Sequence, residues 1–325
     1  MEGADRGANS LSQQRAETLT GKPAARLAAL MPVGILLALS AAFLFSWKPL
    51  LVKLLFADGL DAETQLALRM LLSLPFFVGY ALYAHADRRR RGLPTDLSAR
   101  TVVITLAIGT LYYLSSYLDF LGLRSITAGF ERLILFTYPT FVTLLAWWLH
   151  RERLTSSLIA SVALTYAGLA AVFLTDLHSF GPQVVLGTTQ VLACSLAYAF
   201  YLLWSKGPIG RMGAPLFTTI SSLSASLMLI GQFALKHPWS DLIVSAHAFW
   251  LMLGMAVGAT VIPSFLMSEA IARIGPGPTS VTGGAGPIMT TLLGVWLLGE
   301  PLTVWHVLGM GLVIAGVLVL SRERR

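Results

Sequence analysis

The sequence predicts an all-α membrane protein in which ten transmembrane helices form two inverted five-helix repeats. The 325 residues are 55% hydrophobic and only 12% charged, with a mean hydropathy of +0.72. Soluble domains have roughly 25% charged residues. Ten apolar segments are long enough to cross a bilayer, which takes roughly 20 residues in a helix. In addition, a segment of the first half recurs in the second half.

The first repeat is expected to occupy residues 32–176. The preceding residues 1–31 are polar and have no apolar pattern that could bury a core, so we expect a flexible cytoplasmic tail. A Phe-Ala-Asp-Gly turn at 56–59 ends the first apolar run. The five predicted spans of this repeat are 32–55, 63–84, 101–122, 126–149 and 155–174.

The second repeat is expected to occupy residues 184–320, followed by a short cytoplasmic tail at 321–325. Gly and Pro stop helices, so the Gly/Pro-rich stretches at 207–210, 275–278 and 299–301 are interpreted as turns that reverse the chain. The five predicted spans are 184–205, 214–235, 247–270, 277–298 and 302–320.

The basic residues predict the orientation. If both termini are cytoplasmic, inside segments hold 17 of the 23 Lys and Arg residues, including the run from Arg88 to Arg91, whereas the first outside loop is acidic. The positive-inside rule therefore predicts a multi-pass protein of the cell (inner) membrane with both termini inside. We interpret the Arg88 to Arg91 run as a topology determinant; the alternatives are a site for anionic lipid or nucleic acid.

Residues 136–155 and 284–303 are copies of one another. Nine of the twenty positions are identical, including Pro139 and Pro287, at an offset of 148 residues. Five predicted spans separate the copies, and because five is odd, equivalent residues face opposite sides of the membrane. Inverted repeats are typical of secondary transporters, whose halves exchange inward-open and outward-open states about a central site.

The repeated unit resembles the EamA family of the drug/metabolite transporter superfamily over residues 32–320. The shared pattern is a Pro-containing apolar helix, a Glu-Arg-Leu-Thr or Glu-Pro-Leu-Thr turn, and an Ala-Gly-containing helix. Lys53, Arg69 and the stretches 119–123 and 131–139 match it further. The resemblance implies a ten-helix transporter of a small metabolite, such as an amino acid, nucleobase, amine or drug, with export favoured.

Ionisable residues inside the predicted spans are the candidate residues of the substrate and ion pathway. A charge at the centre of a span costs about 3 kcal/mol on insertion scales, so it usually faces a cavity or a partner. We interpret the cations as contacts for an anionic or carboxylate group and the carboxylates as proton or cation sites. The candidates are Lys48, Lys53, Arg69, Asp119, Glu131, Arg132 and Glu269.

The alternative is that these charges pair with one another, for instance Arg69 with Glu131, and lock the outer helix ends together. Arg69, Glu131 and Arg132 have no evident counterpart in the second half, so we expect an asymmetric site. Pro49 directly follows Lys48 and is expected to bend the first span.

Two tyrosines and the repeated prolines are further candidates. Tyr117 and Tyr138 flank the charged residues and are expected to line a cavity, although aromatic residues also pack in bundles and at membrane interfaces. Pro139, Pro287 and Gly286 are expected to form a hinge, with static close packing as the alternative. Glu152 and Glu300 precede helix starts and are interpreted as structural.

Missing motifs argue against other functions. The sequence has no G-x-x-x-x-G-K-[ST] loop and no H-E-x-x-H motif, so no cofactor or metal centre is expected. The expected partners are a small-molecule substrate and the lipid bilayer, without nucleic acid, and the helix surfaces leave a homodimer open. An intramembrane enzyme and a passive channel for small solutes are the alternatives to a transporter.

Overall fold

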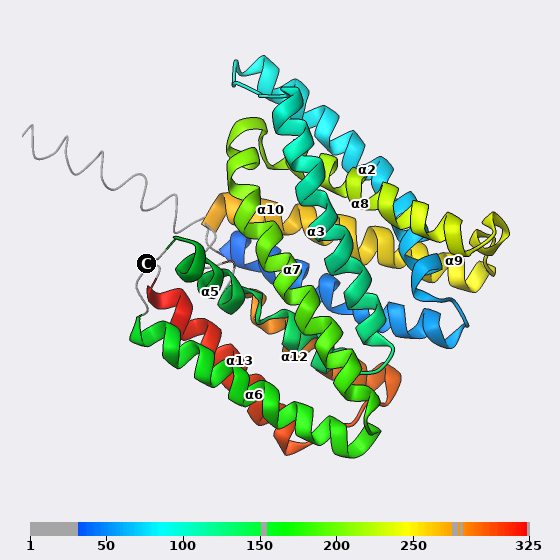
Figure 1. Ribbon diagram of the computed structural model, residues 1–325, viewed down its shortest axis with the longest axis vertical. Helices are drawn as coiled ribbons and strands as arrows, with labels where there is room; N and C mark the ends of the chain where they lie inside the picture. The colour runs from blue at the N-terminus through cyan, green and yellow to red at the C-terminus, as the bar shows by residue number, and fades with distance from the viewer. Residues whose placement is uncertain (1–31, 151–154, 275–278, 280–281, 324–325) are drawn as a thin grey trace, which may run out of the picture.

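The computed structural model describes residues 32–150, 155–274, 279 and 282–323, and every regular element in these ranges is helical (Figure 1). Eight helical stretches of the described chain are long and apolar enough to cross a membrane, and two of them, Ala128–Leu149 and Ala246–Ile271, are each made of more than one helical element. Two shorter apolar helices, Ala285–Leu298 and Val304–Leu320, lie where the ninth and tenth spans were predicted. The predicted all-α membrane class is confirmed.

The helices of the first half begin at capping side chains. Asp61, Ser98, Thr127 and Thr155 each accept a hydrogen bond from a backbone N–H of the first turn that follows, so these polar residues set the helix starts. The helices are Pro32–Ala57, α2 (Ala62–Arg90), α3 (Ala99–Leu123), α4 (Ala128–Leu135), α5 (Tyr138–His150) and α6 (Ser156–Phe180).

The helices of the second half are joined by short connections. They are α7 (Gln183–Met212), α8 (Ala214–Lys236), the 3-10 turn η1 (Trp239–Leu242), α9 (Ala246–Leu253), the π-helical η2 (Gly254–Val261), α10 (Ile262–Ile274), α12 (Ala285–Leu298) and α13 (Val304–Glu323).

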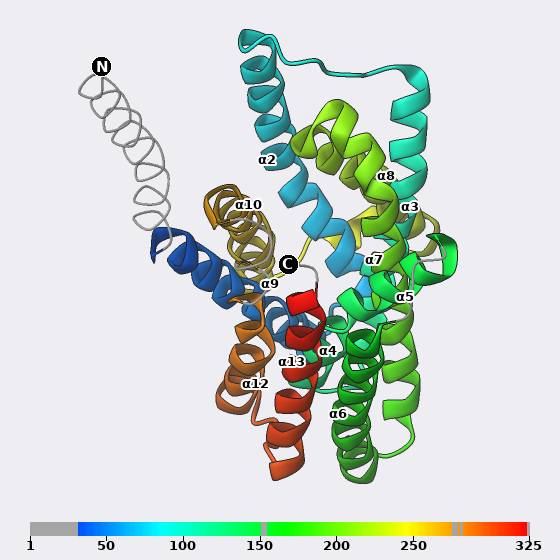
Figure 2. The ribbon, with the colours of Figure 1, turned by 90° about the vertical axis from the view of Figure 1, so that its left-hand side faces the viewer.

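The bundle has two ends of different charge, and Figure 2 shows the course of α2 between them. Helix α2 begins beside Asp58, Asp61 and Glu63, and we call this the acidic end. The same helix finishes in Arg88 to Arg90, and we call that the basic end.

The two repeats interleave to form a single bundle. Helix α6 packs along α13, α3 packs against α7 and α8, and α2 packs against α8, so the main contacts join helices of opposite halves. Figure 1 shows α6 and α13 side by side at one edge. At the centre, α4 packs against α12. The two halves are therefore in direct contact along these helices.

Glycines allow α6 and α13 to approach closely. A Cβ placed on Gly168 would lie 2.6 Å from the carbonyl oxygen of Gly309, whereas one placed on Gly311 would have open space around it. We expect Gly168→Ala to lower the free energy of unfolding by about 1 to 3 kcal/mol, because it forces the two backbones apart. Gly311→Ala, the matched control on α13, should be neutral or slightly stabilising. Thermal unfolding in detergent measures both, and equal effects would contradict this packing.

The fourth predicted span is not one continuous helix. It divides into α4 and α5 at Phe136 and Thr137, directly before Pro139. Proline cannot donate to the carbonyl four residues earlier, and its ring clashes with that carbonyl, which ends the regular helix here. The carbonyl left free is that of Leu135, and it accepts a hydrogen bond from Ser195 Oγ of α7 at 3.3 Å. The copy in the second half also shows a turn, at Gly284, just before α12 and Pro287.

The predicted turn at 207–210 is wrong. Helix α7 continues through Pro208 and ends at Met212, where Gly213 adopts a φ of +89° that suits glycine. Ile209 and Met212 pack with Tyr201 and Phe217, and this burial stabilises the extra turn. The predicted turn at 299–301 is confirmed, whereas the turn at 275–278 lies outside the described residues. The first helix is continuous through Pro49.

Candidate functional site

Four helices of the first half bring charged side chains together in the interior of the bundle. Lys48 comes from the first helix, Arg69 from α2, Asp119 from α3, and Glu131 with Arg132 from α4. Arg69, Asp119 and Glu131 are at most 4% exposed. We call these five residues the central cluster. All five were candidates from the sequence, which did not predict how they pair.

Lys48 is the cation that the two carboxylates share. Its Nζ lies 2.5 Å from Oδ2 of Asp119 and 3.9 Å from Oε1 of Glu131. Only the first distance is that of a hydrogen bond. In a buried, low-dielectric setting two carboxylates repel each other strongly, and one ammonium group balances only one of them. The arrangement therefore favours a proton on one carboxyl group while Lys48 holds the other.

Glu131 is the carboxyl group to which no other residue donates. Its side chain is fully buried, neither of its oxygens accepts a hydrogen bond within the described residues, and its carboxyl group lies against that of Asp119. Asp119 keeps one such oxygen, Oδ1. Buried polar groups in native proteins are nearly always paired, and exceptions often mark sites with a further role.

Arg69 is the cation without hydrogen-bond partners at two of its nitrogens. Its Nε and Nη2 have no such partner within the described chain, and the guanidinium lies 4.9 Å from the ring centre of Phe120. The pairing of Arg69 with Glu131, which the sequence suggested as an alternative, is not formed within 4.0 Å. Lys48 takes the place of Arg69 as the partner of the carboxylates.

Arg132 connects the cluster to the second half. Pro49 cannot donate to the carbonyl of Phe45, which is four residues earlier, and Nη2 of Arg132 donates to that carbonyl instead. Nε of Arg132 donates to Thr290 Oγ1 of α12 at 3.4 Å. Pro49 thus leaves the Phe45 carbonyl free to accept from Arg132, and the first helix, α4 and α12 meet at this side chain.

Gly286, beside Pro287, also lies at this junction. Its carbonyl accepts a hydrogen bond from Ser46 Oγ at 3.2 Å, and Ser46 is fully buried. The residues predicted to form a hinge, Pro139, Pro287 and Gly286, therefore sit next to helix interruptions. Whether they bend during function stays a prediction.

At the acidic end, Glu300 joins the two halves. Its Oε1 lies 3.1 Å from Nζ of Lys53, and its carboxylate accepts hydrogen bonds from the backbone N–H of Ala128 at 2.8 Å and of Gly129 at 3.4 Å. Those N–H groups form the N-terminus of α4, which favours a negative charge. The sequence placed Glu300 at the start of the predicted tenth span, but the helix N-terminus that its carboxylate serves is that of α4, on the other repeat, and not that of α13.

The latch formed by Lys53, Glu300 and the first turn of α4 is tightly packed. A Cβ on Gly129 would lie 2.5 Å from Thr291 Oγ1 of α12, so the two helices touch at this glycine. A depression of about 410 Å³ lies beside the latch and is lined by residues that include Lys53, Arg124, Thr127 and Glu300.

Besides Lys53 in the latch, three candidates lie outside the central cluster. Tyr117 donates to Glu63 Oε1 at 2.8 Å, within a polar group at the acidic end that also contains Lys236. Tyr138 packs edge-on against Tyr198. Glu269 is exposed and pairs with Arg273 one turn along α10, at 2.9 Å.

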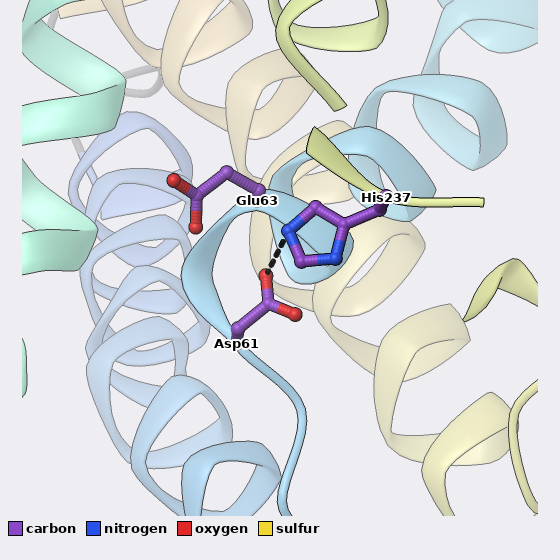
Figure 3. Close-up of side chains that lie close together, drawn as sticks. All are labelled: Asp61, Glu63 and His237. Carbon is purple, nitrogen blue, oxygen red and sulfur yellow. Dashed lines mark ion pairs between the residues drawn. The ribbon is translucent and has the colours of Figure 1, made fainter. Parts of the chain in front are cut away.

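Three side chains at the acidic end bring together atoms that can bind a metal, although no metal centre was expected from the sequence. One ligand atom from each of Asp61, Glu63 and His237 lies within 4.8 Å of the other two (Figure 3). Asp61 already caps α2 through Thr64, and Glu63 lies 2.9 Å from the ammonium group of Lys236. That ammonium competes with any cation for Glu63, so the donor set does not fit a resident metal well.

Asp176 and His306 were also not singled out. Asp176 is fully buried and accepts from Thr127 at 3.2 Å, while His306 Nε2 lies 3.0 Å from its other oxygen. They fasten the ends of α6 and α13 to the start of α4. Their separation of 130 residues left no signal in the sequence.

Comparisons with known proteins follow the same division into repeats. The family model of the EamA-like transporter family matches residues 32–174 and again residues 185–322. The uncharacterized transporter YcbK of Bacillus subtilis is 28% identical over 289 residues, which cover 86% of this chain and 89% of that protein. An uncharacterized transporter of Synechocystis is 25% identical over 317 residues, which cover 90% and 94%. A solved crystal structure with 18% identity covers 91% of this chain with a TM-score of 0.60, which shows a shared fold.

Proposed function

Since the chain belongs to the EamA-like transporter family, we propose that it is a secondary transporter that moves a small organic metabolite by alternating access, coupled to protons. That it is a membrane transporter follows from its family, its relatives and its apolar helices. The solute, such as an amino acid, nucleobase, amine or drug, and the direction, outward, belong to the proposal.

The observation that carries the proposal is the central cluster. Five ionisable side chains lie inside the bundle, and Arg69, Asp119 and Glu131 each keep atoms without a hydrogen-bond partner in the described chain. Ionisable groups at such depth are costly, and they usually mark a substrate or ion pathway. A static role would be better served by fully paired groups.

Alternating access is supported by the latch and the interrupted helices. The latch closes α4 against α12 at the acidic end, and both helices are interrupted next to a repeated proline. We propose that the acidic end faces outside and the basic end faces the cytoplasm, because basic residues favour the cytoplasmic side. In this state the central cluster is shut off from the outside, and release of the latch would open it.

Proton coupling is assigned to Glu131. Its charged neighbours are Asp119, Lys48 and Arg132, and with Lys48 bound to Asp119 the buried Glu131 is best accommodated as a neutral acid. When the cluster opens to water, the proton can leave, because water stabilises the second ionised carboxylate beside Lys48. An inward proton movement would then drive an outward movement of solute.

Reconstitution into liposomes tests the transport class. Liposomes containing the purified protein are loaded with radiolabelled amino acids, nucleobases or amines, and efflux is measured with and without the same unlabelled solute outside. We expect saturable efflux of at least one solute, accelerated several-fold by the external solute and absent from protein-free liposomes. Chemical conversion of the solute would point to an enzyme. Flux that neither saturates nor responds to external solute would point to a channel.

A further inference from the structure

We infer that Arg69 is the binding site for a carboxylate group of the transported solute, an assignment that rests on the proposed function. The transported compounds would then be organic monoanions or zwitterions, such as amino acids. Neutral nucleobases and simple amines would not be substrates.

The free nitrogens of Arg69 have the geometry that a carboxylate needs. Nε and Nη2 lie along the same edge of the guanidinium, where their N–H groups point in parallel. These are the two atoms without a hydrogen-bond partner in the described residues, and Arg69 is only 4% exposed. A parallel pair of N–H donors binds both oxygens of a carboxylate at once. An arginine stays charged in a protein, so the site always presents a cation.

The other two cations of the cluster have hydrogen-bond partners. Lys48 binds Asp119, and Arg132 binds the Phe45 carbonyl and Thr290. Arg69 is therefore the cation of the cluster whose side-on donor pair remains free to bind a solute.

The charge count of the cluster also favours a monoanion. Three cations, Lys48, Arg69 and Arg132, stand against the two carboxyl groups of Asp119 and Glu131. Once Glu131 has released its proton, both carboxyl groups are ionised, one positive charge is left over, and a single carboxylate would neutralise it. In that state a phosphate dianion would reverse the sign, in a buried setting that disfavours net charge.

Phe120 packs against the guanidinium without using its hydrogen-bond donors. The ring centre lies 4.9 Å from the guanidinium carbon, and the ring is itself fully buried. A cation over a ring is attracted by the negative face of that ring, and this contact takes up none of the N–H groups. The guanidinium therefore packs against Phe120, while Nε and Nη2 on its edge have no hydrogen-bond partner in the described residues.

The test compares carboxylates with their own amides. The melting temperature of the purified protein in detergent is measured in the presence of amino acids and monocarboxylic acids. Each acid is compared with its own primary amide. We expect at least one carboxylate to raise the melting temperature of the wild type by several degrees and its amide to have no effect. Arg69→Gln should abolish this shift. Arg69→Lys should lower the affinity for the carboxylate at least tenfold, because an ammonium group lacks the parallel donors. Arg124→Gln, which alters an exposed arginine at the acidic end, should keep the shift.

The unliganded stability of Arg69→Gln separates a binding role from a structural one. Removing a buried charge that lacks hydrogen-bond partners should leave the melting temperature unchanged or raise it, whereas removing a structural ion pair would lower it. A lowered melting temperature, an equal response to acid and amide, or no response to any carboxylate would each overturn the assignment. Saturable transport of only neutral or cationic solutes would also overturn the assignment of Arg69, but it would agree with the proposed transporter function. Carboxylate binding without transport would instead refute the proposed function.

Discussion

Replacing Glu131 with Gln is expected to abolish proton-driven accumulation of solute while leaving solute exchange intact. Gln resembles a neutral glutamic acid in shape and cannot release a proton, so the variant is fixed in one protonation state. Asp119 Oδ1, which has no other hydrogen-bond partner in the described structure, can accept from the amide N–H, so glutamine should be tolerated at this position. Loss of coupling should therefore occur without loss of folding.

The expected effect is large. A gradient of two pH units supplies about 2.7 kcal/mol per proton, enough for roughly 100-fold accumulation of a solute exchanged for one proton. In Glu131→Gln the accumulation ratio should fall to about one, whereas exchange of labelled for unlabelled solute should stay within about threefold of the wild type. Asp87→Asn removes an exposed carboxylate paired with Arg91 and serves as the matched control. Accumulation that still follows the pH gradient in Glu131→Gln would refute the assignment of Glu131.

The second large effect is expected at the latch. Glu300→Ala removes the carboxylate that binds Lys53 and the first N–H groups of α4, and so removes a link between the halves. Hydrogen bonds to a charged group contribute about 2 kcal/mol, so the balance between closed and open states at the acidic end should shift roughly 30-fold. Lys53→Met should shift it less, because the bonds to α4 remain.

Cysteine alkylation measures this shift. Thr291→Cys introduces a thiol where α12 touches Gly129, and Cys194→Ser removes the single native cysteine. A membrane-impermeant maleimide added from the acidic side should react roughly 30-fold faster after Glu300→Ala. Glu300→Ala and Lys53→Met together should be less than additive, because both remove the same ion pair. Asp241→Asn, a change in an exposed carboxylate at the same end, should leave the rate unaltered. An unchanged rate in Glu300→Ala would show that the latch does not hold this end closed.

Helix number and class could be predicted from the sequence because a bilayer imposes a length and an apolar composition on each span. Helix interruptions were harder. Pro139 and Pro208 have the same backbone chemistry, yet the chain breaks before Pro139 and continues through Pro208. The difference lies in the surroundings, since Met212 and Ile209 are packed beyond Pro208, while Ser195 satisfies the carbonyl that Pro139 leaves free.

The members of the site could be predicted, but their partners could not. A charge inside a predicted span is visible in the sequence, so Lys48, Asp119 and Glu131 were found. Which cation balances which carboxylate depends on how helices cross, and Lys48 and Asp119 are 71 residues apart. The ion pair between Lys53 and Glu300 likewise joins the two repeats, whereas the sequence placed Glu300 only before the start of its own helix.

The two repeats share their helix interruptions but not their buried charges. The backbone interruptions next to Pro139 and Pro287 recur in both halves, but the central cluster draws its charges only from the first half. From α12, the second half contributes the Gly286 carbonyl and the Thr290 hydroxyl to the hydrogen bonds described around it. Shared helix geometry can serve the movement common to both halves, while the unshared charges can serve selectivity.

The most direct test of the account measures protons and solute together. Liposomes containing the purified protein and an internal pH-sensitive dye are exposed to a solute identified in the efflux assay, and solute and proton movement are recorded at the same time. The account predicts that a solute gradient alone drives protons in the opposite direction, at a rate that saturates with solute and in a fixed ratio to it. Solute movement with no accompanying proton movement in the wild-type protein would contradict it.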